Sequence, residues 1–281
     1  MGRLFKAFLF KLTRDLTFRI TLIIGAGFAL LISGLFLAMD LMTQAVESSD
    51  RLLTGENMLS ISLIPAQTYS LAVPINVAIF VCLEFTQGSI RNKIIAGNSK
   101  FNIYLSLFLS GLFFCFALMG VYVLLCFGIG CIFGGFDPNG SYFMNGLNFT
   151  PEYLIKLLIG SIFVYISIVS FTIFIATTLR NVGPCIPIII VLLLILSYIA
   201  PIITSINTLL GEDAEGLIWF MRVVDPLYCT SESTFTINDD TRQIQMNILN
   251  ETFISGICSN IFYAAIFFGF GALEFTKRDV K

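Results

Sequence analysis

Residues 101–136 read FNIYLSLFLSGLFFCFALMGVYVLLCFGIGCIFGGF and contain no charged side chain. A helix rises about 1.5 Å per residue, so about 20 residues cross the hydrocarbon core of a bilayer. This run is long enough for one crossing and too short for two crossings joined by a turn. Open sheet edges cannot be satisfied in lipid, and the run does not alternate like a barrel strand. It therefore predicts a transmembrane helix.

Five further charge-free runs share this character. Of the 281 residues, 57% are hydrophobic and 12% are charged, whereas soluble chains are about half apolar and about a quarter charged. The sequence therefore predicts an all-α polytopic membrane protein, with residues 1–281 forming a single domain. We place its six transmembrane helices near residues 20–40, 60–83, 103–133, 155–179, 184–206 and 252–273.

The basic residues predict the orientation of these helices. Twelve of the 16 basic residues fall on one side of the predicted spans, and 14 of the 18 acidic residues fall on the other. The twelve are Arg3, Lys6, Lys11, Arg14, Arg19, Arg91, Lys93, Lys100, Arg180, Lys277, Arg278 and Lys281. The positive-inside rule places both termini in the cytoplasm. A composition rich in Phe, Ile and Asn favours a bacterial source, so we expect the bacterial plasma membrane.

Residues 1–17 have one basic and one apolar helical face. Leu4, Phe8 and Leu12 share the apolar half, while Lys11 and Arg14 lie on the other. This pattern is typical of an interfacial helix that lies on membrane lipid at the inner leaflet. On the outer side, residues 212–251 form the longest connection. Within it, Gly216–Val224 is apolar but too short to span, which predicts a re-entrant or interfacial segment.

The inner segment 84–100 reads EFTQGSIRNKIIAGNSK. Gly88 can break the preceding helix, and Gly97 can cap a short second helix. Between them, Ile90, Ile94 and Ile95 predict an apolar face, and Arg91, Asn92 and Lys93 predict a polar one. Such a helix could serve as a docking site for another protein. An ordinary basic loop that touches lipid headgroups remains equally compatible with the residues alone.

The pattern E-x-x-x-G-[ST]-hydrophobic-R-N-K-x-x-x-G-x-S in this segment resembles the inner loop of ABC export permeases of the ABC-2 type. Ser89 and Lys100 stand where that family usually has Thr and Arg. The resemblance implies that 84–100 is the coupling helix, that 1–17 is an elbow helix, and that 212–251 contains a re-entrant gate. The implied coupling residues are Glu84, Gly88, Arg91, Asn92, Lys93 and Gly97.

The same resemblance implies two copies of a cytoplasmic ABC ATPase as partners and a permease homodimer or pseudo-dimer. The chain has no G-x-x-x-x-G-K-[ST] loop, so we expect ATP and Mg to be bound by the partner and no cofactor by this chain. It has no histidine and no ionisable residue near the middle of a predicted span. We therefore predict a permease rather than an enzyme, with no metal site and no nucleic-acid partner.

Two questions stay open at this stage. An ATP-independent secondary transporter or channel remains the alternative, because backbone and hydroxyl oxygens can bind sodium. By analogy with the family, the substrate is an amphipathic or hydrophobic molecule, such as an antimicrobial peptide, an antibiotic or a lipid. Uncharged polar residues within the spans either line a substrate path or join neighbouring helices. They are Gln67, Ser70, Asn76, Ser197, Tyr198 and Thr204.

Overall fold

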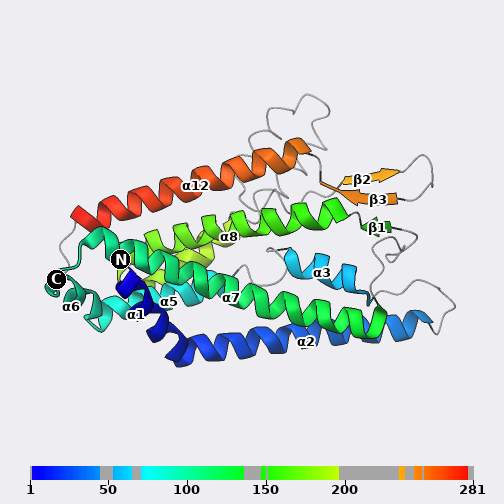
Figure 1. Ribbon diagram of the computed structural model, residues 1–281, viewed down its shortest axis with the longest axis horizontal. Helices are drawn as coiled ribbons and strands as arrows, with labels where there is room; N and C mark the ends of the chain where they lie inside the picture. Colours follow the sequence, from blue (N-terminus) through cyan, green and yellow to red (C-terminus); the bar gives the residue numbers. More distant parts are fainter. Residues whose placement is uncertain are drawn as a thin grey trace.

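The computed structural model describes residues 2–44, 53–64, 71–135, 147–149, 151–195, 234–237, 244–248 and 250–277. Within these residues, four long helices run along the long axis of the molecule (Figure 1). They are α2 (Leu16–Gln44), α7 (Lys100–Gly134), α8 (Pro151–Leu179) and α12 (Asn250–Lys277). All four are long and apolar enough to cross a membrane. The chain therefore has the character of a multi-pass helical membrane protein.

These four helices contain the first, third, fourth and sixth predicted spans. The helix Val182–Ile195 covers the beginning of the fifth, near 184–206. The rest of that span lies outside the described residues, as does the predicted re-entrant segment Gly216–Val224.

The second predicted span, near 60–83, is not one continuous helix. α3 (Gly55–Leu63) ends early, and α5 (Ala72–Thr86) begins nine residues beyond it. Ile64 caps α3 in an extended conformation, with φ −75° and ψ 110°. Its neighbour is Pro65, and the ring of a proline disfavours helical geometry in the residue before it. Pro74 is tolerated because it lies in the first turn of α5, where the amide has no helical partner.

The N-terminal helix α1 (Gly2–Arg14) forms as predicted but packs differently. It ends beside Asp15, and α2 begins at the next residue. Leu4, Phe8 and Leu12 on its apolar face are buried in the protein core, and the ring of Phe8 meets that of Phe80 edge-on at 6.5 Å between centroids. The apolar face of α1 is thus covered by protein rather than by lipid alone.

A small sheet that the sequence did not predict lies at the end of the molecule away from α1 (Figure 1). It contains β1 (Leu147–Phe149), β2 (Thr234–Ile237) and β3 (Ile244–Asn247), in the order β1-β3-β2. β1 pairs in parallel with β3, and β2 pairs antiparallel to it. The sheet joins the connection before α8 to the one before α12. Both connections were predicted to be on the same side of the membrane.

Glycines 130 and 134 of α7 allow a close backbone contact at this same end. A Cβ atom added at Gly130 would lie 2.7 Å from the carbonyl oxygen of Thr54, and one added at Gly134 would overlap the carbonyl of Leu53. The amide of Gly55 also donates a 3.0 Å hydrogen bond to the carbonyl of Gly135. Small residues four apart permit such an approach between membrane segments.

Candidate functional site

The segment that follows α5 turns sharply and forms a short separate helix. α6 (Ser89–Ile95) is bent by 58° from α5. Gly88 occupies the left-handed region at φ 68°, and Gly97 beyond α6 does so at φ 84°. Both conformations favour glycine because a Cβ atom is strained there. As predicted, Gly88 therefore separates α5 from α6, and Gly97 follows the C-terminal end of α6. α6 lies at the end of the molecule that carries α1, called here the basic end (Figure 1).

A buried carboxylate, Glu84, joins three elements at the basic end. Its side chain is 1% exposed. Its carboxylate oxygens form ion pairs with the ammonium nitrogen of Lys11 in α1, at 2.6 Å, and with that of Lys93 in α6, at 2.8 Å. The hydroxyl of Ser89 also donates to it. A charge taken out of water needs such partners to offset its desolvation. Glu84, at the end of α5, therefore fixes α1 and α6 to the last turn of that helix.

The ionisation of Glu84 follows from these contacts. Burial alone would raise the pKa of its carboxyl group, because desolvation disfavours the charged form. The hydrogen bonds from Lys11, Lys93 and Ser89 act in the opposite sense and together lower the pKa below its ordinary value. Glu84 is thus a carboxylate at neutral pH, and its negative charge holds the two lysines in place.

Lys93 faces the protein rather than the solvent, which corrects the predicted division of α6 into faces. Its ammonium group lies 3.1 Å from the centroid of the buried Phe8 ring. Ile90 is fully buried as predicted, but Ile95 is 73% exposed. The physical reason is that residues three and four apart share a helix face. Lys93 and Ile94 therefore share the inner face with Ile90, and Glu84 attracts Lys93 there.

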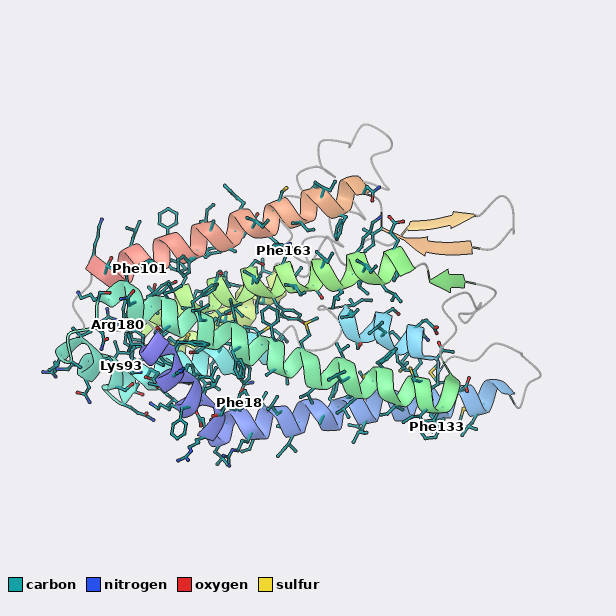
Figure 2. All side chains as sticks on the ribbon, in the orientation of Figure 1. Phe18, Lys93, Phe101, Phe133, Phe163 and Arg180 are labelled. Carbon is teal, nitrogen blue, oxygen red and sulfur yellow. The ribbon has the colours of Figure 1, made fainter. Side chains whose placement is uncertain are left out.

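The outward part of α6 and its cap is a mixed surface. Arg91, Asn92, Ile95 and Ala96 are exposed there, and we call them the exposed α6 surface. Figure 2 shows Lys93 and Arg180 at the same end of the molecule. An exposed isoleucine beside a cationic group and an amide can bury apolar area against a partner and still hydrogen-bond it.

The structure brings together only part of the predicted site. All six predicted coupling residues lie in the α5–α6 bend and its flanks. Of the predicted path residues, Asn76 alone is described. Its amide oxygen accepts a 2.7 Å hydrogen bond from Thr21 of α2, and its nitrogen donates to the carbonyl of Ala72. This arrangement joins two helices. Outside the described residues lie Gln67, Ser70, Ser197, Tyr198 and Thr204.

Sequence reasoning missed the contribution of α1 to this site. Lys11 and Phe8 stand more than 70 positions before Glu84 and Lys93, and no local spacing links them. The amphipathic pattern of residues 1–17 placed Phe8 on the buried face, but it did not identify Lys11 as the lysine that pairs with Glu84. Among the described residues, no group of three metal-ligating side chains comes together at the site or elsewhere.

The chain is thus a multi-pass helical membrane protein in which the short helix α6 is held against the basic end. Comparison of the chain with known protein families, with curated protein sequences and with solved structures gave no match.

Proposed function

We propose that this chain is the membrane-spanning permease subunit of an ATP-driven exporter of the ABC-2 type. In this proposal, α6 seats on a separate cytoplasmic ATPase that binds ATP and Mg. The observation that carries the proposal is the buried Glu84, which ties α6 to α5 and α1. Because a short helix held only by backbone would yield when pushed, this anchor gives α6 the stiffness that force transmission needs.

The placement of the connections supports six crossings. Between Leu53, which contacts Gly134, and Gln87, which contacts Lys11, the chain passes from one end of the molecule to the other. Arg180 lies at the basic end and β2 at the sheet end, so we infer a return passage between them. With α2, α7, α8 and α12, these two passages give six. An even number of crossings places both termini on one side, and the positive-inside rule makes that side cytoplasmic.

The proposed mechanism is mechanical. Closure of two ATPase subunits on ATP displaces α6, and the Glu84 ion pairs transmit the displacement to α5 and α1 together. Two permease copies then alternate between inward and outward access, since six helices are too few for a roomy path in one chain. The substrate class proposed is amphipathic or hydrophobic, such as a peptide, an antibiotic or a lipid-like molecule.

A photocrosslinking residue in place of Ile95 tests this proposal in the full chain in its native membrane. We expect a covalent adduct with a protein whose sequence contains the G-x-x-x-x-G-K-[ST] loop, identified by mass spectrometry. A crosslinker in place of Lys277, also exposed at the basic end, is the matched control and should give little of that adduct. Adducts only with proteins that lack the loop, or equal adducts at both positions, would count against the proposal.

The alternative is an ATP-independent transporter or channel. It predicts that the purified chain alone, in liposomes, passes ions or solute down a gradient without ATP. The proposed permease predicts no such flux in the absence of its partner.

A further inference from the structure

A pocket of about 420 Å³ lies at the basic end, between the corner where α1 meets α2 and the last turns of α5. The charged residues that line it are Lys11, Arg14, Asp15 and Glu84. Lys11 and Glu84 form the 2.6 Å ion pair that joins α1 to α5, so their charges are compensated within the protein. The pocket therefore presents one further cation, Arg14, and one further anion, Asp15.

Arg14 and Asp15 do not neutralise each other. The guanidinium of Arg14 lies 4.2 Å from the centroid of the Phe10 ring, and it forms no ion pair in the described part of the chain. A cation–π contact of this kind leaves the positive charge in place. One carboxylate oxygen of Asp15 accepts a 3.1 Å hydrogen bond from the amide of Thr17 and so caps α2. The other oxygen accepts no hydrogen bond from any described residue and can bind a ligand.

The rim of this pocket is apolar and exposed. Phe10 and Leu16 line the pocket and are 58% and 69% exposed, and Ile20, one turn further along α2, is 45% exposed. α2 begins at Leu16 and is long and apolar enough to cross a membrane. Exposed apolar side chains beside charged ones, at the start of such a helix, are typical of the headgroup level of a bilayer. Such a rim suits a lipid better than a soluble ligand.

We propose that the pocket between Arg14 and Asp15 binds the headgroup of a zwitterionic phospholipid with a primary ammonium group, of the phosphatidylethanolamine class. The phosphate accepts hydrogen bonds from Arg14, and the ammonium group donates to the open oxygen of Asp15. Phosphatidylcholine carries the same charges, but its quaternary ammonium group has no N–H to donate. An anionic phospholipid would place a negative charge near Asp15 with no cation to offset the repulsion. The proposal needs no ATPase partner and stands apart from the transport function.

A lipid in this pocket would lie beside the ion pair that holds α1 to α5. The Lys11 side chain is 40% exposed in that pair, whereas the Glu84 side chain is 1% exposed. A bound headgroup with its acyl chains would exclude water from Lys11, and charges interact more strongly where water and salt are excluded. The attachment of α1 to α5 would then depend on the lipid composition of the surrounding leaflet.

Lipid retention by the purified full-length chain tests the proposal. The chain is placed in nanodiscs of equal parts phosphatidylethanolamine, phosphatidylcholine and phosphatidylglycerol with matched acyl chains, transferred to detergent, and analysed by native mass spectrometry. We expect phosphatidylethanolamine to be retained preferentially. Asp15→Asn keeps an oxygen that can cap α2 but removes the charge, and it should reduce the preference over phosphatidylcholine about fivefold, as expected for a partly exposed ion pair. Arg14→Gln should reduce the retention of phosphatidylethanolamine by a similar factor.

Two control variants accompany these substitutions. Lys6→Gln removes a positive charge from an exposed position of α1 outside the pocket and should retain phosphatidylethanolamine like the unaltered chain. Arg14→Lys keeps the charge and should recover part of the retention lost in Arg14→Gln. Equal retention of the three lipids, preferential retention of phosphatidylglycerol, or an equal loss in Lys6→Gln would overturn the site. Binding of soluble phosphoethanolamine as tightly as the lipid would overturn the lipid and assign the pocket to a soluble zwitterion.

Discussion

At the scale of single residues, Glu84 shows how a buried charge is retained in an apolar protein. Desolvation penalises it, yet two lysines and a serine hydroxyl surround it. The net contribution of a buried ion pair to stability is small, but removing one partner leaves an uncompensated charge. Glu84 and its three partners therefore act as a unit, and the effects of substitutions within the unit are not expected to add.

The first prediction concerns Lys93. We expect Lys93→Met to lower the free energy of unfolding by about 3 kcal/mol, because the Glu84 carboxylate loses the partner on α6. Thermal unfolding of the purified chain in detergent measures the change. Glu84→Gln combined with Lys93→Met should cost less than the sum of the two single substitutions. Lys6→Met, at an exposed position of α1, is the control and should change little. Additive effects would show that Glu84 and Lys93 do not interact.

The second prediction concerns how the stability of the folded protein depends on pH. The pKa of Glu84 is lower in the folded protein than in the unfolded chain, so the folded state binds fewer protons near the ordinary pKa of about 4.3. The stabilisation is complete above that pH and is lost as the pH falls through the lowered folded pKa. Midpoints of thermal unfolding at decreasing pH should therefore fall more steeply for the unaltered chain than for Glu84→Gln. Parallel curves would exclude the assigned role of Glu84.

At the scale of helices, glycine positions decide which segments approach closely. We predict that Gly134→Ala lowers the free energy of unfolding by about 2 kcal/mol or more, because its methyl group overlaps the carbonyl of Leu53. Gly128→Ala is the matched control in the same helix, since a Cβ atom there meets nothing within 4 Å. The control should be neutral or slightly stabilising, because alanine favours helices. Equal effects of the two substitutions would contradict the close contact.

Much of the helical structure could be predicted from the sequence. The long helices follow from charge-free runs because lipid imposes helical backbone pairing on any apolar segment of that length. Pro65 indicates that α3 ends just before it. The charge-free run 57–83 nevertheless reads as one span, because hydropathy does not depend on backbone geometry. To predict that Lys93 faces inward, one would have to know that Glu84 is buried and pairs with it. The sheet depends on the pairing of β1 with β3, whose partners Leu147 and Ile244 stand 97 positions apart, and no local sequence pattern indicates such a pairing.

At the scale of the whole molecule, the distribution of charge predicts two opposite ends, and the fold has them: one carries α1 and α6, and the other carries the sheet. We predict that a cysteine in place of Lys277 is labelled by a membrane-impermeant maleimide only after the cells are opened. A cysteine in place of Met42, 71% exposed near the other end of α2, should be labelled in intact cells. Both variants are made in a background without the seven native cysteines. Labelling of both positions in intact cells would refute the proposed orientation.

The most direct test of the docking proposal is the affinity of the purified chain for the proposed ATPase partner, measured by binding in detergent. We predict that Ile95→Glu weakens binding at least about tenfold, because it places a charge at the centre of the exposed α6 surface. Lys277→Glu, a larger change of charge at the same end of the molecule, should bind like the unaltered chain. Equal affinity in all three would show that the ATPase does not dock on α6.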